Sequence, residues 1–277
     1  MDHIGIIGLG FLGGTLRRYF EKNRRQYRLF FYDTGKHIGS PEEVNKADII
    51  FVCVNTPYSK KEGSMDASFL ESALKNIRGN KIVVVRSTVL PGTIARLQKR
   101  FPQLKILLNP EFLREKYPDE DFVRPPMQIV GYTKQSKPYA KQILSLLPKA
   151  PHMATMPAET AEFIKYFVNS FLAMKVTFVN AFWDACGKTG ADYRILQNAV
   201  ASEPRIGPSH LNVWYEGFRG YSGSCFPKDT KSLIGFFRAR GIDYSFLAAM
   251  DTYNDRLLKK QKIKINFGYP RTKNSKS

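Results

Sequence analysis

The sequence predicts an α/β fold in which a doubly wound parallel sheet is followed by an all-helical domain with one long central helix. Short apolar runs alternate with amphipathic stretches through the first half of the chain, a pattern typical of a parallel sheet with covering helices. A glycine-rich turn follows the first apolar run. Near residue 155 the alternation gives way to a long, unbroken helical pattern. We therefore expect a first domain over residues 1–155, a second over 156–260 and a basic tail over 261–277.

The predicted strands are short runs rich in Ile, Val, Leu and Phe. In chain order they are Ile4–Ile7, Arg28–Tyr32, Asp48–Val54, Lys81–Arg86, Lys105–Leu108 and Gln128–Gly131. Several of these runs are apolar at consecutive positions, as strands covered by helices on both faces must be. The amphipathic helical patterns between them are Leu12–Asn23, Ser68–Asn76, Thr93–Arg100 and Lys137–Leu147.

The long helix is predicted to begin at Pro157, because proline suits the first helical turn and Glu162 suits the positive end of a helix. Nothing breaks the helical pattern before Cys186, and Gly187 and Gly190 follow as stop signals. We expect the phenylalanine-rich side of this helix to pack on another helix or on a second subunit. Its phenylalanines include Phe163, Phe167, Phe171 and Phe178. Further helices are predicted at Tyr193–Ala201 and Pro227–Arg240.

The chain is strongly basic. Its 277 residues include 43 Lys and Arg against 24 Asp and Glu, which gives a formal net charge of +19. Such an excess predicts attraction to anions, among them nucleotide phosphates, nucleic acids and acidic surfaces. Because no nucleic-acid-binding motif accompanies it, we expect no specific nucleic-acid partner. No acidic residue follows Asp255, and we interpret the last stretch, GYPRTKNSKS, as a solvated tail.

The cysteines and histidines predict neither disulfides nor a metal site. Cys53, Cys186 and Cys225 are too few and too scattered for a disulfide framework, which points to a reducing compartment. The four histidines lie far apart and pair with no cysteine at metal-ligand spacing. We find no secretory signal and no apolar run near the roughly 20 residues that span a bilayer. A cytoplasmic protein without a membrane or metal partner is therefore expected.

The turn after the first predicted strand reads G-x-G-x-x-G. In this motif the glycines permit a tight turn, a close approach of the backbone to a pyrophosphate, and close packing of helix on strand. The residues expected to bind the cofactor there are Gly8, Gly10, Phe11, Leu12 and Gly13. Asp33 lies about 20 residues past the third glycine, where a carboxylate binds the ribose hydroxyls of NAD. The motif predicts a Rossmann-type domain that binds NAD, although Lys36 and His37 nearby leave NADP open.

Cys225 is the candidate nucleophile. It lies within Gly223–Asp229, where glycine, serine and charged residues surround it, whereas Cys53 lies in an apolar strand and is interpreted as a packing residue. With Pro227 in the first helical turn, the thiol is expected at a helix N-terminus beside Lys228. Both features favour the thiolate, which is the form that attacks carbonyl carbons.

Two further pairs are spaced four residues apart. Lys165 and Asn169 share one face of the long helix, although a lysine that extends to solvent would have the same spacing. Glu111 and Glu115 share a face if their segment is helical, and a surface pair of carboxylates is the default interpretation.

Taken together, the motifs resemble the UDP-glucose/GDP-mannose dehydrogenase family, its UDP-glucose-oxidising members above all. The resemblance extends from Ile4 to about Asn254. The segments that carry it are GLGFLGG at 8–14, VNTP at Val54–Pro57, RSTVLPGT at Arg86–Thr93, NPEFLRE at Asn109–Glu115, AEFIKYFVNSFLA at Ala161–Ala173, RIGPSH at Arg205–His210 and GSCFPKD at Gly223–Asp229.

The resemblance implies a four-electron oxidation of a nucleotide sugar, UDP-glucose to UDP-glucuronate, with two NAD molecules. It implies that Cys225 traps the aldehyde as a thiohemiacetal that is oxidised to a thioester, and that Glu111 assists its hydrolysis. Lys165, Asn169 and Asp229 would arrange the alcohol, a water and the developing oxyanion.

The resemblance also implies the remaining site residues and the assembly. On the cofactor side these are Val54, Asn55, Thr56, Pro57, Ser87, Thr88 and Glu115, with Thr88 also counted among the catalytic residues. On the substrate side they are Glu111, Phe112, Lys165, Asn169, Arg205, Tyr221 and Cys225. A homodimer through the long helix is implied, in which Arg205 reaches the neighbouring subunit's substrate.

Two departures from the family leave alternatives open. Ser222 stands where the family has a glycine before the cysteine motif. Family members also continue into a third domain that binds the nucleotide, so we expect a two-domain form here. The alternatives are an enzyme of the β-hydroxyacid dehydrogenase type that transfers one hydride, and a catalytically impaired or partner-dependent relative that binds nucleotides or other anions.

Overall fold

The structure is a computed structural model that describes residues 2–22, 26–265 and 267. The chain divides into two compact units. Unit 1 comprises residues 1–56 and 66–165, and unit 2 comprises residues 57–65 and 166–277. Most of the predicted basic tail, residues 266 and 268–277, lies outside the described residues.

Unit 1 contains a seven-stranded sheet with the strand order β2-β1-β3-β6-β7-β8-β9. Its strands are β1 (Asp2–Ile7), β2 (Tyr27–Tyr32), β3 (Ile49–Val52), β6 (Ile82–Val85), β7 (Lys105–Leu108), β8 (Met127–Tyr132) and β9 (His152–Pro157). All neighbouring strands are parallel except β7 and β8, which are antiparallel. The chain leaves β1 towards β2 and then returns to β3 on its other side, so the order reverses at β1. In doubly wound sheets, ligands bind at the carboxyl ends of the strands beside such a reversal.

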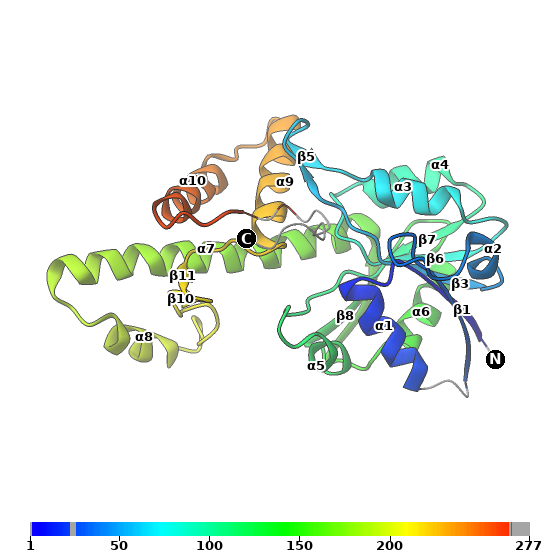
Figure 1. The fold of residues 1–277 in the computed structure, drawn as a ribbon, viewed down its shortest axis with the longest axis horizontal. Coiled ribbons are helices and arrows are strands. Elements are labelled where there is room, and N and C mark those ends of the chain that lie inside the picture. Colours follow the sequence, from blue (N-terminus) through cyan, green and yellow to red (C-terminus); the bar gives the residue numbers. More distant parts are fainter. Residues whose placement is uncertain (1, 23–25, 266, 268–277) are drawn as a thin grey trace. The chain divides into compact units, whose positions relative to one another are not determined.

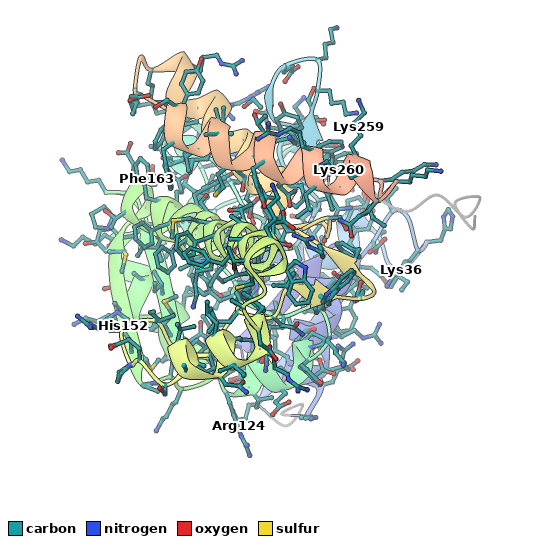
Figure 2. All side chains as sticks on the ribbon, turned by 90° about the vertical axis from the view of Figure 1, so that its left-hand side faces the viewer. Lys36, Arg124, His152, Phe163, Lys259 and Lys260 are labelled. Atoms are coloured by element: carbon teal, nitrogen blue, oxygen red, sulfur yellow. The ribbon has the colours of Figure 1, made fainter. Side chains whose placement is uncertain are left out.

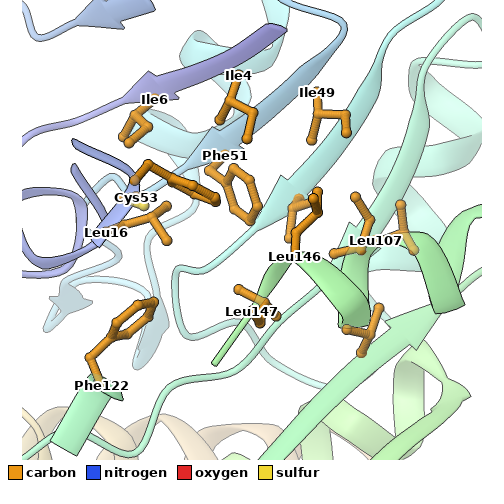
Figure 3. Close-up of a cluster of buried hydrophobic side chains, with 14 of the residues drawn as sticks. Ile4, Ile6, Leu16, Ile49, Phe51, Cys53, Leu107, Phe122, Leu146 and Leu147 are labelled. Atoms are coloured by element: carbon orange, nitrogen blue, oxygen red, sulfur yellow. The ribbon is translucent and has the colours of Figure 1, made fainter. Parts of the chain in front are cut away.

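Helices cover both faces of this sheet. They are α1 (Phe11–Lys22), α2 (Pro41–Val44), α3 (Ser68–Lys75), α4 (Thr93–Arg100), α5 (Pro118–Val123) and α6 (Ala140–Leu146), which a short 3-10 turn precedes. Figure 1 shows α3 and α4 on one face and α1, α5 and α6 on the other. The core on the second face is drawn in Figure 3, where Leu16 of α1, Phe122 of α5 and Leu146 of α6 pack with Ile6 and Phe51 of the sheet.

Unit 2 is built on the long helix α7 (Ala158–Thr189), which begins in unit 1. Its other helices are α8 (Tyr193–Ala201), α9 (Phe226–Ala239) and α10 (Ser245–Lys260). Two small hairpins accompany them, β4 (Tyr58–Ser59) with β5 (Ser64–Met65), and β10 (Trp214–Tyr215) with β11 (Phe218–Arg219). The first hairpin packs on α9 so closely that a Cβ at Gly235 would lie 2.0 Å from the carbonyl oxygen of Gly63. Neither hairpin was expected in an all-helical domain.

The predicted fold class is confirmed, and the differences are local. Pro157 ends strand β9 rather than opening the long helix, because β9 pairs in parallel with β8 up to Pro157. The long helix passes through Gly187 and ends at Thr189, before Gly190 with φ +79°. Helix α10 was missed, although its sequence has an apolar run at 246–250 and two leucines near its end, Leu257 and Leu258. In the described part of the chain, no helix combines the length and apolar character that a bilayer crossing requires.

Candidate active site

The glycine-rich loop forms a backbone cradle at the carboxyl end of β1. Gly8 has φ +84°, and a Cβ there would lie 2.8 Å from the carbonyl oxygen of Cys53. A Cβ at Gly13 would lie 1.8 Å from the carbonyl oxygen of Gly8, so this helix start requires glycine. At Gly10, in contrast, an added Cβ would meet no atom within 4 Å. The open side of the loop at Gly10 therefore fits a diphosphate that approaches the backbone.

Asp33, at the end of β2, is fixed against this loop. Its carboxylate accepts the backbone N–H of Leu9 at 2.5 Å and that of Lys36 at 2.9 Å. The ammonium of Lys36 donates to the carbonyl oxygen of Leu9 at 2.5 Å. The structure thus confirms that the acidic residue and the glycine loop lie together, which is the arrangement that binds an adenosine ribose and its diphosphate.

The next two strands bring further predicted cofactor residues to the same edge. The hydroxyl of Thr56 donates to the carbonyl oxygen of Thr88 at 2.7 Å, and that of Ser87 donates to the carbonyl oxygen of Val54 at 2.6 Å. These segments meet because β3 and β6 are parallel neighbours that end at the same edge. Asn55 is exposed there, whereas Pro57 belongs to unit 2.

Glu111 and Lys165 form a buried ion pair in unit 1. The Lys165 ammonium donates to the Glu111 carbonyl oxygen at 2.7 Å and to its carboxylate at 3.0 Å. Their side chains are only 8% and 6% exposed. The ring of Phe112 lies 5.5 Å from the same ammonium. Lys165 therefore does not extend to solvent, and Glu111 is not a surface carboxylate, so both of the simpler interpretations are wrong.

The charge of Glu111 is stabilised inside the protein. Burial by itself would raise the pKa of Glu111, but Lys165, the N–H of Leu113 and Arg86 outweigh it and hold that pKa below its usual value. Arg86 is itself buried, and its guanidinium donates to the side-chain oxygen of Asn109. A buried carboxylate of this kind is ionised at neutral pH and can accept a proton from a nearby water.

The predicted helical face shared by Glu111 and Glu115 does not exist. Residues 109–114 have no regular secondary structure, and Glu115 is exposed in a turn. The segment is held by short-range contacts instead, among them the bond from the Leu113 N–H to the Glu111 carboxylate at 2.8 Å. The structure therefore does not bring Glu115 to Glu111.

Unit 2 contains a second polar cluster, at the start of α9. Asp229 is fully buried, and its carboxylate accepts the amide of Asn169 at 2.6 Å and the ammonium of Lys228 at 2.5 Å. Cys225 is exposed at the N-cap position of the same helix, with its carbonyl oxygen bonded to the N–H of Asp229 at 2.9 Å. The positive end of a helix favours negative charge on a side chain at this position. Cys53 differs sharply, since burial raises the pKa of its thiol to about 12.

The loop that leads to Cys225 is anchored to α10 by Asn254. This fully buried amide accepts the backbone N–H of Tyr221 at 2.9 Å and donates to the carbonyl oxygen of Tyr221 at 2.9 Å. Gly220 has φ +93°, and a Cβ there would lie 2.7 Å from the Asn254 oxygen. Arg205, by contrast, is 88% exposed and pairs with Glu203 at 2.8 Å.

Three residues that support the site were missed in the sequence. Arg86 directly follows a strand, and a charged residue at the end of an apolar run was the available signal. Glu162 was expected to stabilise the start of its own helix, but its carboxylate accepts the N–H groups of Gly92 and Ile94 at the start of α4. Asn254 gave no signal. Among the described residues, no group of three or more His, Cys, Asp or Glu side chains is arranged to hold a metal ion.

Comparison with known families matches both parts of the chain. Residues 14–147 match the NAD binding domain of the UDP-glucose/GDP-mannose dehydrogenase family, and residues 159–256 match its central domain. The first match agrees with the NAD expected from the glycine motif and Asp33.

Individual relatives agree with the family match. UDP-glucose 6-dehydrogenase of Rickettsia conorii is 36% identical over 217 residues, which are 75% of this chain and 49% of that protein. UDP-glucose 6-dehydrogenase TuaD of Bacillus subtilis is 31% identical over 249 residues, which are 85% of this chain and 51% of that protein. The chain thus spans about half the length of the curated relatives it matches.

Solved structures extend the comparison to the fold. A UDP-glucose dehydrogenase from Pyrobaculum islandicum aligns with a TM-score of 0.78 and 27% identity, covering 95% of this chain and 71% of that one. A GDP-mannose dehydrogenase from Pseudomonas aeruginosa aligns with a TM-score of 0.63 and 26% identity, covering 93% of this chain and 69% of that one. With both domains matched in sequence and the fold matched in space, the chain belongs to the UDP-glucose/GDP-mannose dehydrogenase family.

Proposed function

We propose that the chain catalyses the NAD-dependent, four-electron oxidation of a nucleotide sugar, UDP-glucose to UDP-glucuronate. The observation that carries this proposal is the cluster on the first turn of α9, where the exposed Cys225 precedes the buried Asp229–Asn169 pair. A dehydrogenase that transfers a single hydride has no need of a thiol nucleophile. A second oxidation does need one, because the aldehyde must be held covalently until it reacts again.

In the proposed mechanism Cys225 acts on the aldehyde. Its thiolate adds to the aldehyde carbon and gives a thiohemiacetal. Loss of a hydride from that carbon leaves a thioester, and a water then adds and releases the carboxylate and the thiol. The glycine loop and Asp33 would hold NAD, which would supply the hydride acceptor for both oxidations. Asp229 orients the amide of Asn169, which would donate to the oxygen that becomes negative.

The buried ion pair of Lys165 and Glu111 in unit 1 would supply the positive and negative charges that the reaction needs. Lys165 is cationic beside Glu111 and would stabilise an alkoxide-like oxygen on the substrate. Glu111, ionised at neutral pH, would take the proton of the water that hydrolyses the thioester. We assign Thr88, Phe112, Tyr221 and Arg205 to the lining of the substrate and cofactor sites.

We also propose that two copies associate through α7. Phe167 and Phe178 are 71% and 61% exposed, and each contacts a second exposed phenylalanine one turn further along, Phe171 and Phe182. Figure 2 labels Phe163, which begins this row. A row of aromatic side chains on one helix can pack against its own copy across a two-fold axis. Sedimentation should then give a dimer for the wild type and a monomer for Phe167→Ser/Phe178→Ser, while the control Phe246→Ser on α10 stays dimeric.

We further propose that residues 1–155 bind the cofactor, and that residues 156–260 carry the nucleophile and the dimer contact. A reactive thiol that must stay reduced suits a reducing compartment, so we assign the enzyme to the cytoplasm.

The test is the number of NADH molecules formed for each sugar consumed. The purified chain is given NAD with UDP-glucose, and then other nucleotide sugars. We expect two NADH per sugar, and Cys225→Ser should abolish acid formation while Cys186→Ala, a buried cysteine of the same unit, preserves it. One NADH per sugar would favour the single-hydride alternative. NAD binding without turnover of any sugar would favour the impaired or partner-dependent alternative.

A further inference from the structure

Unit 2 contains a second feature that the proposed oxidation does not use, a cleft of about 850 Å³. The β4–β5 hairpin, α9, the end of α10 and the segment after it form its walls. The lining residues are Tyr58, Lys60, Lys231, Asp255, Leu258, Lys259, Lys262, Ile263, Lys264, Ile265 and Phe267. Figure 2 labels Lys259 and its neighbour Lys260 at the C-terminal end of α10. Lysine is thus the commonest residue in this lining.

The charge around the cleft is only partly compensated. Lys231 is held by Asp251 at 2.6 Å and Asp255 at 2.8 Å. Burial would lower the pKa of Lys231, but these two carboxylates outweigh it and raise that pKa, so Lys231 is charged. Within the described residues, no ion pair holds the other four lysines of the cleft, Lys60, Lys259, Lys262 and Lys264.

A structural role explains only part of this cluster. Lys259 and Lys260 lie in the last turn of α10, where cations stabilise the negative end of a helix. That argument does not apply to Lys60 in the hairpin or to Lys264 beyond the helix. These side chains gather because the Tyr58 N–H donates to the carbonyl oxygen of Phe267 at 2.9 Å, which fixes the last described segment beside the hairpin.

Lys262 is the most informative residue of the cleft. Its φ is +58°, and it ends α10 in a turn where the N–H of Ile263 donates to the carbonyl oxygen of Leu258 at 3.0 Å. Helices that end in this way usually have glycine at the left-handed position, because a side chain there is strained. A strained lysine that lines a cleft of like charges points to a ligand.

We propose that this cleft binds a chain of two or three phosphate groups, either on a nucleotide or as inorganic polyphosphate. Ammonium groups bind phosphate oxygens as point charges, and several around one cleft match an anion of several charges. The volume lies within the range of small-molecule sites, whereas a nucleic-acid strand needs a longer basic track with stacked aromatic side chains. The proposal concerns binding alone and holds whether or not the chain oxidises a sugar.

The test compares two variants that lose the same charge. Lys60→Gln/Lys262→Gln/Lys264→Gln alters the cleft, and Lys134→Gln/Lys141→Gln/Lys149→Gln removes three exposed lysines of unit 1. Calorimetry with tripolyphosphate and with ATP is run near physiological salt, both without NAD and with saturating NAD, so that binding at the glycine loop is separated from binding at the cleft. We expect saturable binding that weakens about tenfold in the cleft variant and less than about twofold in the control.

Three outcomes would overturn the proposal. The first is binding of tripolyphosphate that does not saturate. The second is equal weakening of its binding in both variants. The third is cleft-dependent binding of a short DNA duplex together with tripolyphosphate binding that does not depend on the cleft. Equal affinities for ATP and tripolyphosphate would assign the site to the phosphates themselves, and tighter ATP binding would assign it to a nucleotide. Lys262→Gly gives an independent check, because it should raise the melting temperature by relieving strain and still weaken tripolyphosphate binding.

Discussion

The two units stabilise their polar clusters in different ways. In unit 1, Glu111 and Lys165 are buried charges that depend on each other. In unit 2, Cys225 is exposed, and its surroundings are held by the ion pair of the buried Asp229 with Lys228. Two uncharged amides add to it, Asn169 at Asp229 and Asn254 at Tyr221. Loss of the Lys165 cation in unit 1 should therefore cost more stability than loss of the Asn254 amide in unit 2. The electrostatics of the proposed reaction reside in unit 1, and the geometry of its nucleophile resides in unit 2.

The largest effect is expected when the ion pair is broken. Lys165→Met leaves the Glu111 carboxylate buried without its cation and should lower the free energy of unfolding by about 3–5 kcal/mol. Glu111→Leu/Lys165→Met removes both charges and should recover most of that loss. Urea unfolding of the two variants measures the difference. Glu111→Leu is measured as the second single variant. If the loss of stability in the double variant equals the sum of the losses in the two single variants, the pair is not coupled.

The pH dependence of unit 1 gives the next test. Burial raises the pKa of Glu162 to about 7, even though the N–H groups of Ile94 and Gly92 oppose that shift and Glu159 adds to it. Between about pH 4.5 and 7 the folded chain therefore binds more protons than the unfolded chain, so stability falls as pH rises, by up to about 3 kcal/mol. Glu162→Gln cannot titrate and should flatten this part of the curve. The free energy of unfolding is measured by urea unfolding at pH 5 and at pH 8. An equal difference between these two values in the wild type and in Glu162→Gln would contradict the assignment.

Two substitutions in the glycine loop distinguish effects on the stability of unit 1 from effects on NAD binding. Gly13→Ala forces a methyl group against the Gly8 carbonyl oxygen and should cost about 1–3 kcal/mol, together with NAD binding. Gly10→Ala meets no protein atom, so its stability should change by less than about 0.5 kcal/mol. NAD titration of Gly10→Ala should nevertheless show clear weakening, because the methyl group occupies the space of the diphosphate. Wild-type affinity in Gly10→Ala would argue against the cradle.

A substitution at Asn254 in unit 2 should have a small effect on the free energy of unfolding and a large effect on kcat. Asn254→Ala leaves the N–H and carbonyl of Tyr221 without their partner and should cost about 1–2 kcal/mol. NAD affinity should remain at the wild-type value while kcat falls, since the change affects the loop before Cys225. Asn254→Asp keeps the acceptor for the Tyr221 N–H but loses the donor to the Tyr221 carbonyl oxygen. Its free energy of unfolding should therefore lie between those of the wild type and Asn254→Ala. A fall in NAD affinity would show that the effect is not confined to unit 2.

The sequence was most informative where function depends on local order. The glycine loop, Asp33 and the alternation of strands and helices follow from spacing along a few dozen residues, and the structure confirms them. The edge formed by Thr56 and Thr88 follows from parallel pairing once β3 and β6 are assigned. These features depend on periodicity and turn chemistry, which a single sequence displays.

The sequence was least informative where partners are distant along the chain. Lys165 meets Glu111 across 54 residues, and Asn254 meets Tyr221 across 33. The environments of these side chains follow from tertiary packing, so the simpler surface interpretations stood until the fold was known. Pro157 was misassigned for the same reason, since pairing of β9 with β8 outweighs the preference of proline for a helix start.

The β4–β5 hairpin has a consequence for how the protein is made. Its residues lie within the sequence of unit 1, but they pack on α9, against Gly235 of unit 2. During synthesis at about 5–20 residues per second, the hairpin leaves the ribosome on the order of ten seconds before α9. The hairpin must wait for its packing surface until most of the chain exists. A nascent or truncated chain that stops before α9 therefore carries an unpartnered hairpin, which makes it a natural target for chaperones and proteases.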